Sequence, residues 1–296
     1  MGKKILLIVN PMAGKNQART ALYDIVSTLC DDCNHVTVMM TTKHGDATDY
    51  AMKYCGDYDI VSCVGGDGTL SEVVCGLMQV KNPPPIGYIP LGSTNDVATT
   101  LKIPRNPAQA ARDMLEGKPI TIDIGSFNDT FFTYVAAFGA FTDVPYTTPQ
   151  ESKNALGPLA YFIEGVTRLP HISNAHAVVT HDGGTVEGDF IYGSISNSTS
   201  VAGFVKLTEQ NVGLDDGLFE VLLIKHPDRL TEFNQILSDI ITQKYLHDAV
   251  IFFKTTKIKF EFSEPVAWTR DGEDGGYNTV VEAYNNNHAL SIIVRQ

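Results

Sequence analysis

The sequence predicts an α/β domain followed by a domain built mostly of antiparallel strands. Up to Ile120, short runs rich in valine and isoleucine alternate with amphipathic stretches. After Gly117 the pattern changes to short strand-like runs, many of them separated by Gly, Asn and Asp turns. Strand–helix alternation implies right-handed crossovers and a parallel sheet, whereas closely spaced strands and turns are typical of an antiparallel sandwich or barrel.

The first half of the chain contains four strand-like runs separated by helical patterns. The runs cover residues 5–9, 36–40, 60–64 and 86–89. A first helix is expected within residues 18–29, where apolar side chains recur on one face. Gly45-Asp46 opens a second helix, and residues 70–78 form a third. Pro107 is expected in the first turn of another helix, which ends at Gly117.

The second half is expected to be an antiparallel β-structure with two helical interruptions. The strand-like runs cover residues 120–124, 131–137, 175–180, 190–195, 218–224, 250–253, 258–262 and 280–283. The helical interruptions are expected at residues 159–166 and 230–241. We therefore predict domains at residues 1–124 and 125–284, with the last residues, about 285–296, able to return to the first domain.

Composition excludes several classes of protein. The 296 residues carry 22 Lys+Arg against 34 Asp+Glu, a formal net charge of −12, which disfavours a protein that binds nucleic acid through its overall field. No stretch approaches the roughly 18 uncharged apolar residues of a spanning helix, so no transmembrane segment is expected. Five cysteines, an odd number, suit a reducing cytoplasm better than a disulfide framework. We expect a cytoplasmic protein.

Each of the four N-terminal strands is followed by a loop of glycine and small polar residues. In a parallel sheet these loops lie at one edge, outside the carboxyl ends of the strands, where α/β proteins bind ligands. Three of the loops run into helices, whose N-termini attract anions. Ordinary turn composition would explain one or two such loops, whereas four of them indicate a phosphate-binding rim. The loops cover residues 10–15, 41–46, 65–69 and 90–96.

Two well-known phosphate-binding motifs do not fit these loops. The first loop fails as a Walker A motif, since Val9 and Asn16 stand where that motif needs Gly and Ser or Thr. The third fails as a Rossmann fingerprint, because Ser71 replaces its third glycine. Asp67 lies inside the third loop and would repel a phosphate held directly against it. It makes sense where a divalent cation lies between carboxylate and phosphate, as in magnesium-dependent phosphoryl transfer.

With Gly65-Gly66-Asp67-Gly68-Thr69 the sequence resembles the diacylglycerol kinase catalytic-domain family, in particular its soluble bacterial lipid kinases. The resemblance covers nearly the whole chain. It implies an ATP-binding α/β domain like that of NAD kinases and phosphofructokinases, joined to a β-sandwich, with the active site in the cleft between them. It rests on Asn10-Pro11-x-x-Gly14, residues 65–70 followed by Glu72, Pro90-Leu91-Gly92-Ser93-x-Asn95-Asp96, Leu214-Asp215-Asp216-Gly217 and Asp271-Gly272-Glu273.

The resemblance also implies roles for individual residues. Asp67 and Asp96 would lie near the catalytic magnesium, and Glu273 would be the catalytic base. A second, structural magnesium, found in some bacterial members, would be held by the side chain of Asp216 and the carbonyls of Gly213 and Leu218. The ATP-binding residues would be Asn10, Pro11, Met12, Ala13, Gly14, Thr41, Gly65, Gly66, Asp67, Gly68, Thr69, Leu70, Ser71, Ser93 and Asn95.

The segment that contains Glu273 can also be interpreted without the family. Residues 268–276 hold three carboxylates and three glycines in an otherwise β-rich region, although a plain turn needs one Asp-Gly. A carboxylate that accepts the proton of an attacking hydroxyl is what phosphoryl transfer to an alcohol requires. Asp215-Asp216-Gly217, by contrast, is interpreted from the residues alone as a turn.

The leading interpretation is an ATP- and Mg²⁺-dependent kinase that phosphorylates a lipid hydroxyl. Diacylglycerol, giving phosphatidic acid, is the first candidate acceptor, and phosphatidylglycerol or a sphingoid base could take its place. A soluble-substrate kinase of the NAD kinase or phosphofructokinase type is a competing function, as is a non-catalytic nucleotide-binding regulator. The protein would meet its lipid at the membrane surface, peripherally and transiently, and a homodimer stays open. Lys254, Lys257 and Lys259 could face an anionic membrane or protect an edge strand, which is the commoner reason.

Overall fold

The computed structural model describes residues 2–139, 174–197, 200–201, 205–206, 214–226, 236 and 247–295. The expected helix at residues 159–166 and nearly all of that at 230–241 lie outside these residues. The chain divides into two compact units. Unit 1 comprises Met1–Gly125, Asp129–Tyr134 and Asn286–Gln296, and unit 2 comprises Ser126–Asn128 and Val135–Asn285.

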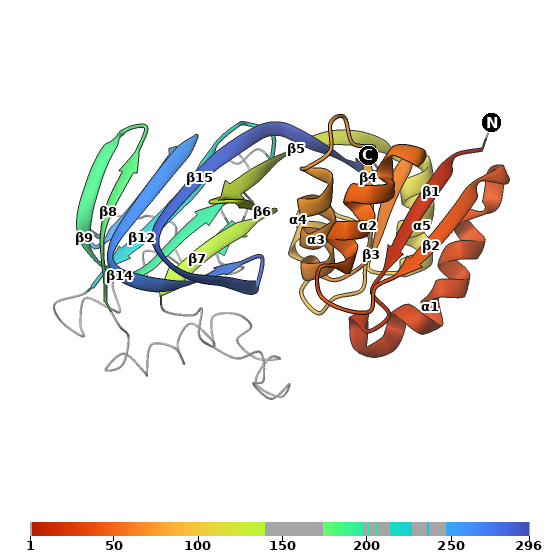
Figure 1. Ribbon diagram of the computed structural model, residues 1–296, viewed down its shortest axis with the longest axis horizontal. Helices are drawn as coiled ribbons and strands as arrows, with labels where there is room; N and C mark the ends of the chain where they lie inside the picture. Colours follow the sequence, from red (N-terminus) through yellow and green to blue (C-terminus); the bar gives the residue numbers. More distant parts are fainter. Residues whose placement is uncertain are drawn as a thin grey trace. The chain divides into compact units, whose positions relative to one another are not determined.

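Unit 1 contains the expected parallel sheet. Its strands β1 (Lys4–Val9), β2 (His35–Met40), β3 (Ile60–Gly65) and β4 (Ile86–Pro90) lie in the order β4-β3-β1-β2 (Figure 1). The end of β15 (Glu273–Val294) adds a further parallel strand beside β4, with Ile292 paired to Ile86. All four predicted N-terminal strands are therefore confirmed within one or two residues at each end.

The helices of unit 1 follow the predicted pattern with two differences. The first begins before its apolar stripe, at the Asn10–Gly14 loop. A short helix at Asp96 was not expected, because five residues are too few to show helical periodicity. The last helix begins at Pro107 and is ended by Gly117, as predicted. The helices are α1 (Ala13–Leu29), α2 (Asp46–Tyr54), α3 (Asp67–Leu77), α4 (Asp96–Thr100) and α5 (Pro107–Glu116), with 3₁₀ turns at Asp31–Cys33 and Cys55–Asp57.

The core of unit 1 lies on both faces of its sheet. All residues of β1 after Lys4 are buried, as expected of an inner parallel strand. Ile5, Leu7 and Val9 pack in one apolar cluster with residues of α1 and α5, among them Leu29 and Met114. Helices α2 and α3 pack against each other, and right-handed crossovers place them on the opposite face of the sheet from α1.

Unit 2 is an antiparallel β-structure. Its strands follow the order β13-β12-β9-β7-β14-β15, and β8 pairs with both β9 and β14 (Figure 1). The strands are β7 (Val135–Gly139), β8 (Ala175–His181), β9 (Gly184–Ser196), β12 (Phe219–Lys225), β13 (Val250–Thr255), β14 (Lys257–Arg270) and β15, with the short pair β10 (Ser200–Val201) and β11 (Val205–Lys206). Strands β5 (Lys118–Phe127) and β15 contribute residues to both units.

Three predicted strand-like runs of the second half have different bounds in the structure. The run at 131–137 is two strands, because β6 (Thr130–Phe132) ends before Thr133 and β7 begins at Val135. The runs at 258–262 and 280–283 are parts of the long hairpin β14–β15, which turns at Asp271. Polar residues that alternate along the exposed face of this hairpin hide its strands in a search for apolar runs.

An aromatic cluster forms the core of unit 2. Trp268 is 1% exposed, and its ring centroid lies 4.8 Å from that of Phe138 and 5.2 Å from that of Phe127. Phe138 also contacts Phe260 edge to face at 5.7 Å. Gly193 makes room for this packing, since a Cβ there would lie 2.2 Å from Cε1 of Phe138.

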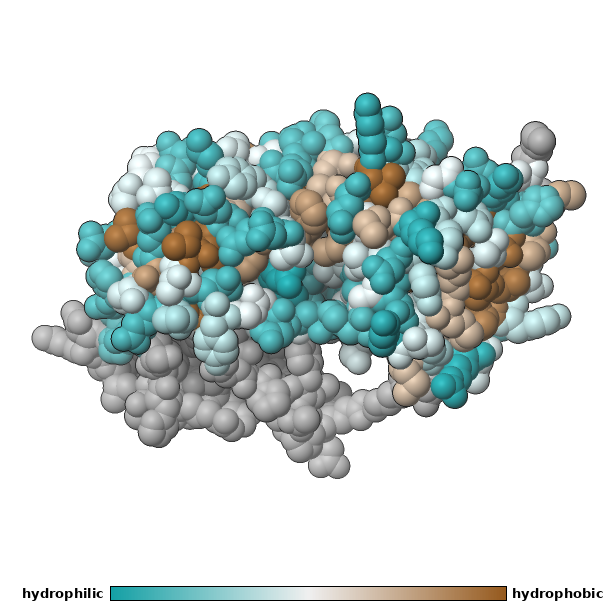
Figure 2. Space-filling view, viewed as in Figure 1, coloured by the Kyte–Doolittle hydropathy of each residue, from teal (hydrophilic) through white to brown (hydrophobic). Residues whose placement is uncertain are grey.

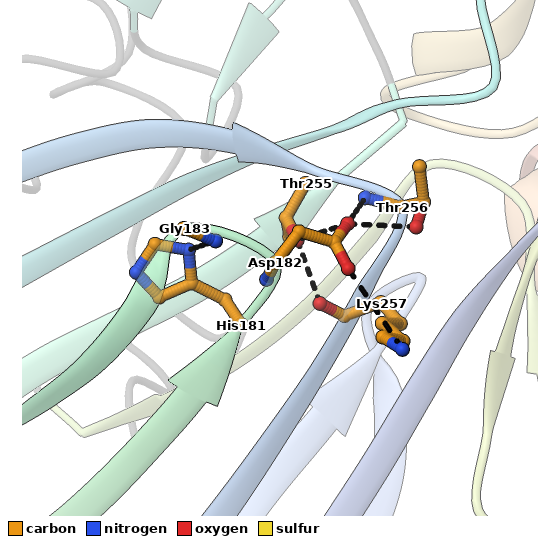
Figure 3. A network of polar contacts seen from close by, with 6 residues as sticks. All are labelled: His181, Asp182, Gly183, Thr255, Thr256 and Lys257. Atoms are coloured by element: carbon orange, nitrogen blue, oxygen red, sulfur yellow. Dashed lines mark hydrogen bonds and ion pairs between the residues drawn. The ribbon is translucent and has the colours of Figure 1, made fainter.

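A polar network joins two turns of unit 2 (Figure 3). Asp182, in the turn between β8 and β9, accepts hydrogen bonds from the Thr256 amide at 2.8 Å, the Thr256 hydroxyl at 2.7 Å and the Thr255 hydroxyl at 3.0 Å. The hydroxyl and amide of Thr256 lower the pKa of Asp182 to about 2. The network ties this turn to the connection between β13 and β14.

The exposed large apolar side chains are scattered over the described surface. On the face drawn in Figure 2 the hydrophobic residues form small separate patches among hydrophilic ones. Such isolated residues are normal for a globular surface. They are Met12, Tyr23, Val38, Met40, Met52, Tyr277, Val280 and Tyr284.

Candidate active site

The loops after β1 and β3 meet through Asn10. Its amide Nδ2 donates to the hydroxyl of Thr69 at 3.1 Å, and its Oδ1 accepts from the Met12 amide at 3.0 Å. The backbone amide of Asn10 donates to the carbonyl of Val64 at 2.9 Å. The structure thus brings together two predicted nucleotide-binding residues that are far apart in the sequence.

Backbone contacts close the rim between the loops after β1, β3 and β4. A Cβ on Gly66 would lie 3.1 Å from the Cα of Gly92, and one on Gly14 would lie 2.6 Å from the carbonyl oxygen of Leu91. Gly14 also has a φ of +61°, which glycine adopts at little cost. These glycines allow the loops to lie against one another, with the N-termini of α1 and α3 beside them.

Asn95 shapes the loop after β4. It lies in the left-handed conformation, with φ and ψ both 54°, and is 3% exposed. Its Oδ1 accepts from the Gly92 amide at 2.8 Å and its Nδ2 donates to the Gly92 carbonyl at 2.8 Å. Asn95 therefore closes the turn that presents the exposed Ser93 and leads into Asp96, the first residue of α4.

Negative charge gathers at the carboxyl ends of β3 and β4. Burial raises the pKa of the Tyr88 hydroxyl, and the charges of Asp67 and Asp96 add to the rise. Burial likewise raises the pKa of the Cys63 thiol, with contributions from Asp67 and Glu72. Asp67 and Asp96, the first residues of α3 and α4, thus both act on the buried Tyr88 between the two loops.

This pair of carboxylates fits the magnesium expected for phosphoryl transfer. Mg²⁺ is usually held by one or two carboxylates together with substrate phosphates, rather than by a cage made of protein alone. The described residues contain no group of three or more His, Cys, Asp or Glu side chains arranged as a metal site. Asp67 and Asp96 are the residues that could hold the ion beside a bound nucleotide.

The loop after β2 is held by two acidic residues that sequence reasoning did not select as site residues. Asp46 Oδ2 accepts from the Thr42 amide at 2.7 Å, the Thr42 hydroxyl at 2.8 Å and the Lys43 amide at 3.0 Å. These bonds, led by the Thr42 amide, hold the pKa of Asp46 below its ordinary value. Glu72 contacts the same loop from α3. The predicted residue Thr41 is anchored to β1, since its amide donates to the Val9 carbonyl at 2.9 Å.

The fold accounts for Asp271 and Gly272, which form a turn, but it gives no such account of Glu273. Asp271 and Gly272, with φ of 48° and 82°, form the two-residue turn of the β14–β15 hairpin, and Arg270 pairs with Glu273. Asp271 is 3% exposed, and its Oδ1 accepts from the Val135 amide at 3.1 Å. Glu273 is the first residue of β15, and its side chain is exposed.

Only part of the expected structural magnesium site lies within the described residues. Gly213 lies outside them. Asp216 Oδ1 accepts from the Leu218 amide at 3.0 Å, and its Oδ2 lies 3.3 Å from the ammonium of Lys254. The same ammonium lies 2.9 Å from Oε1 of the fully buried Glu220. A lysine cation therefore already neutralises the carboxylate that was expected to bind the metal.

Glu220 is a buried acid beside that pair. Burial raises the pKa of Glu220 to about 7, and the hydrogen-bonding ammonium of Lys254 opposes the rise. Glu220 and Lys254 face each other directly across β12 and β13, which explains why a lysine on a late strand is drawn inward. Lys254 thus has a partner in the interior of unit 2, and neither a membrane nor edge protection is needed to explain it.

Asp123 is a further buried acid that sequence reasoning did not select. It is 0% exposed on β5, and its Oδ1 accepts from the His288 amide at 2.7 Å. The sequence indicates this acid by placing an aspartate between Ile122 and Ile124 inside a strand. A buried charge costs free energy unless it is hydrogen-bonded or paired. The bond joins β5 to the part of β15 that belongs to unit 1.

The helices of the described residues include none with the length and apolarity needed to span a membrane.

Comparisons with known proteins agree with the motifs. A family model described as the diacylglycerol kinase catalytic domain matches residues 4–127. A second, described as the YegS C-terminal NAD kinase beta sandwich-like domain, matches residues 142–294. The two models correspond to the predicted α/β domain and β-sandwich domain, so the predicted fold class is confirmed.

Individual relatives match over most of their length. A protein named diacylglycerol kinase from Bacillus subtilis (strain 168) is 31% identical over 293 residues, covering 97% of this chain and 96% of the relative. One of the same name from Staphylococcus aureus (strain bovine RF122 / ET3-1) is 34% identical over 278 residues, 93% of this chain and 88% of the relative. A crystal structure of a diacylglycerol kinase from Bacillus anthracis str. Sterne superposes with a TM-score of 0.80 at 26% identity, covering 98% of this chain and 96% of that one.

Proposed function

Since the chain belongs to the diacylglycerol kinase catalytic-domain family, we propose that it is an ATP- and Mg²⁺-dependent lipid kinase that phosphorylates diacylglycerol to phosphatidic acid. The observation that carries the proposal is the rim of unit 1, where glycine loops after β1, β3 and β4 touch and Asp67 and Asp96 lie at the first turns of two helices. The names of the relatives support diacylglycerol as the acceptor.

In this proposal the loops of unit 1 bind the nucleotide mainly through their backbone. Amides at the N-termini of α1 and α3 point toward the rim and favour phosphate oxygens. The bond between Asn10 and Thr69 fixes the first loop against the third, so the amides are in place before the nucleotide arrives. Preorganised donors of this kind stabilise the charge of a transferring phosphoryl group without further rearrangement.

In this proposal, acidic residues bind the metal ion and accept the proton of the acceptor. Asp67 and Asp96 would hold Mg²⁺, which supplies charge neutralisation to the phosphates when it is bound. Glu273 is the proposed general base, an exposed carboxylate that accepts the proton of the acceptor hydroxyl as that oxygen bonds to the γ-phosphorus of ATP and ADP leaves. The protein would bind its lipid acceptor at the membrane surface, so we expect it to associate with the membrane peripherally and transiently.

The experiment is transfer of labelled phosphate from ATP to a panel of acceptors in detergent micelles. We expect labelled phosphatidic acid, and no product in excess EDTA. Labelling of phosphatidylglycerol or a sphingoid base instead would keep a lipid kinase and change its acceptor. Labelling of NAD or a sugar phosphate alone would favour a soluble-substrate kinase, and ATP binding without transfer to any acceptor would favour a regulator.

Asp67→Asn provides the matched variant for this assay. It should abolish turnover while the melting profile of the protein is kept, because the amide keeps the size of the side chain and removes its charge. Asp57→Asn is the control, since Asp57 is an exposed aspartate of the same unit outside the rim. Near-normal turnover of Asp67→Asn would contradict the proposal.

A further inference from the structure

Glu72 lies in α3, the helix that begins at Asp67, and makes three contacts with the segment that follows β2. Its Oε1 lies 3.0 Å from Nδ1 of His44, and its Oε2 accepts from the Ala47 amide at 3.1 Å. Its backbone carbonyl accepts from the Thr48 hydroxyl at 2.9 Å. A single acidic residue therefore connects the helix that carries Asp67 with both the loop and the first turn of α2.

The bond to Ala47 compensates for a missing helix cap. Gly45, the residue before α2, has a φ of 89° and no side chain that could accept from the first amides of the helix. A carboxylate at a helix N-terminus satisfies such an amide and interacts favourably with the helix dipole. Here that carboxylate comes from α3, so the start of α2 is fixed relative to α3 and not only to its own chain.

The two helices form a closely packed pair. A Cβ on Gly76 would lie 2.4 Å from the carbonyl oxygen of Thr48 and 2.9 Å from Cβ of Ala51. Only a glycine in α3 permits this approach, and it brings Glu72 within reach of the N-terminus of α2. The packing therefore supports the same connection as the hydrogen bonds do.

The loop between β2 and α2 is consequently held from three sides. Thr41 is bonded to β1 through the Val9 carbonyl. Asp46, the first residue of α2, accepts hydrogen bonds from the amides of Thr42 and Lys43 and sets the local shape of the loop. Glu72 sets the position of that loop relative to α3, whose N-terminus carries Asp67.

We infer that Glu72 is a positioning residue of the nucleotide site: through Ala47 and His44 it holds the Thr41–Gly45 loop at the distance from α3 that nucleotide binding requires. The inference rests on the proposed function, since it concerns the same ATP site. It assigns a role to the one acidic residue of the glycine-loop motif that the phosphoryl transfer itself does not use. Its loss should weaken binding of the nucleotide and leave the chemical step nearly unchanged.

The test compares ATP binding and steady-state kinetics of the wild type with Glu72→Ala and Glu72→Gln. Glu72→Ala should raise the Kd and the KM for ATP by about 10- to 100-fold, the range for a lost bond to a charged group, with kcat within about threefold. Glu72→Gln keeps the size and an acceptor oxygen for the Ala47 amide, so its Kd and KM should fall between those of the wild type and Glu72→Ala. This partial rescue would not follow from general damage to the fold.

Thr48→Val is the matched control. It removes the other bond between α2 and α3, the one to the Glu72 carbonyl, without touching the loop. It should lower the melting temperature and leave the KM for ATP within about twofold of the wild type. An equal rise in KM in Thr48→Val would mean that helix packing alone matters and would overturn the inference.

The outcomes separate this inference from the proposed function. A wild-type protein that binds no ATP would overturn both. A wild type that binds ATP, with an unchanged Kd in a folded Glu72→Ala, would overturn the role of Glu72 alone. A fall in kcat at constant KM would also overturn it, because Glu72 would then act in the chemical step.

Discussion

The three acidic residues at the turn of the β14–β15 hairpin differ in their burial and in their hydrogen bonds. Asp271 is buried in the turn and bonded to the Val135 amide, and Asp274 accepts from the Gly276 amide at 2.8 Å. Glu273 lies between them and is exposed. In the sequence, the three residues form one acidic cluster among glycines. The structure gives Asp271 and Asp274 hydrogen bonds that shape the hairpin, and Glu273 stays the proposed base.

Glu273→Gln tests the proposed base. The amide keeps the size of the side chain and most of its hydrogen bonding but cannot accept the proton of the acceptor hydroxyl. We expect kcat to fall by about 10²–10⁴-fold with little change in the apparent affinity for ATP, measured where chemistry limits the rate. Glu264→Gln, an exposed glutamate of the adjacent strand, is the control. Normal turnover of Glu273→Gln would move the role to Asp96, since Asp271 is occupied in the turn.

Asp182 gives a pH-dependent prediction for unit 2. Its pKa is lowered to about 2 by the Thr256 bonds, below the value of 3.8 for a free aspartate. A group with a depressed pKa stabilises the folded state fully above the unfolded pKa, and this contribution is lost as the pH falls toward the folded one. Asp182→Asn should therefore melt below the wild type at pH 7, and the gap should close between about pH 4 and pH 2.

The fluorescence of Trp268 is the suitable measurement for Asp182→Asn. Trp268 is the one tryptophan of the chain and is buried in the core of unit 2, so its signal follows the unfolding of that unit. Asp248→Asn, an exposed aspartate of the same unit, serves as control. A gap between Asp182→Asn and wild type that stays constant down to pH 2 would show that the charge of Asp182 does not stabilise the turn.

Secondary-structure elements were predictable where their signals are local. The helix α5 was placed by Pro107 and Gly117, and Asn106 caps it by accepting from the Gln109 amide at 2.9 Å. The long strands β14 and β15 were predicted only in part, because many of their residues face solvent and are polar. The periodicity of apolar residues detects the buried part of a strand. A strand that is hydrogen-bonded to neighbouring strands can continue well beyond that part.

The contact between α2 and α3 yields a prediction for the packing of two elements. Gly76→Ala places a methyl group 2.4 Å from the Thr48 carbonyl oxygen, so the helices must separate. We expect a loss of about 1–3 kcal/mol in the free energy of unfolding, more than the higher helix propensity of alanine returns. Thermal melts followed by circular dichroism at the helical band would measure this loss.

Gly56→Ala is the matched control for Gly76→Ala. A Cβ on Gly56 would meet nothing within 4 Å, so the substitution adds a methyl group without a clash. Its melting temperature should stay close to that of the wild type. Equal effects of the two substitutions would show that close packing of α2 and α3 is not what Gly76 provides.

At the scale of the whole molecule, the C-terminal end of β15 adds a strand to the sheet of unit 1, which the N-terminal residues begin. Ile292 of β15 pairs with Ile86 and is 0% exposed, and Ile293 is 6% exposed. Arg295 forms ion pairs with Asp113 at 2.9 Å and Glu116 at 3.1 Å. The chain therefore passes through unit 2 and returns before unit 1 is complete.

Truncation after Asn285 should unfold unit 1 or leave it only partly folded. Loss of buried aliphatic side chains at about 2–5 kcal/mol each is comparable with the stability of a typical domain, about 5–15 kcal/mol. We expect the helical circular dichroism signal and ATP binding to be lost together. Truncation after Val294 removes the ion pairs of Arg295, worth about 0–1 kcal/mol, and is the control. An unchanged helical signal after the longer truncation would contradict this role of β15.

The sequence by itself determined the first four strands of unit 1, its helices α1, α2, α3 and α5, the two-part architecture and the glycine loops, because these depend on residues close together in the chain. Only the tertiary structure decided which partners the polar side chains have. Glu72 bonds to Ala47 across 25 positions, and Lys254 to Asp216 across 38. No periodicity or motif records such pairs, since they exist only after helices and strands have packed and buried charges have had to find partners.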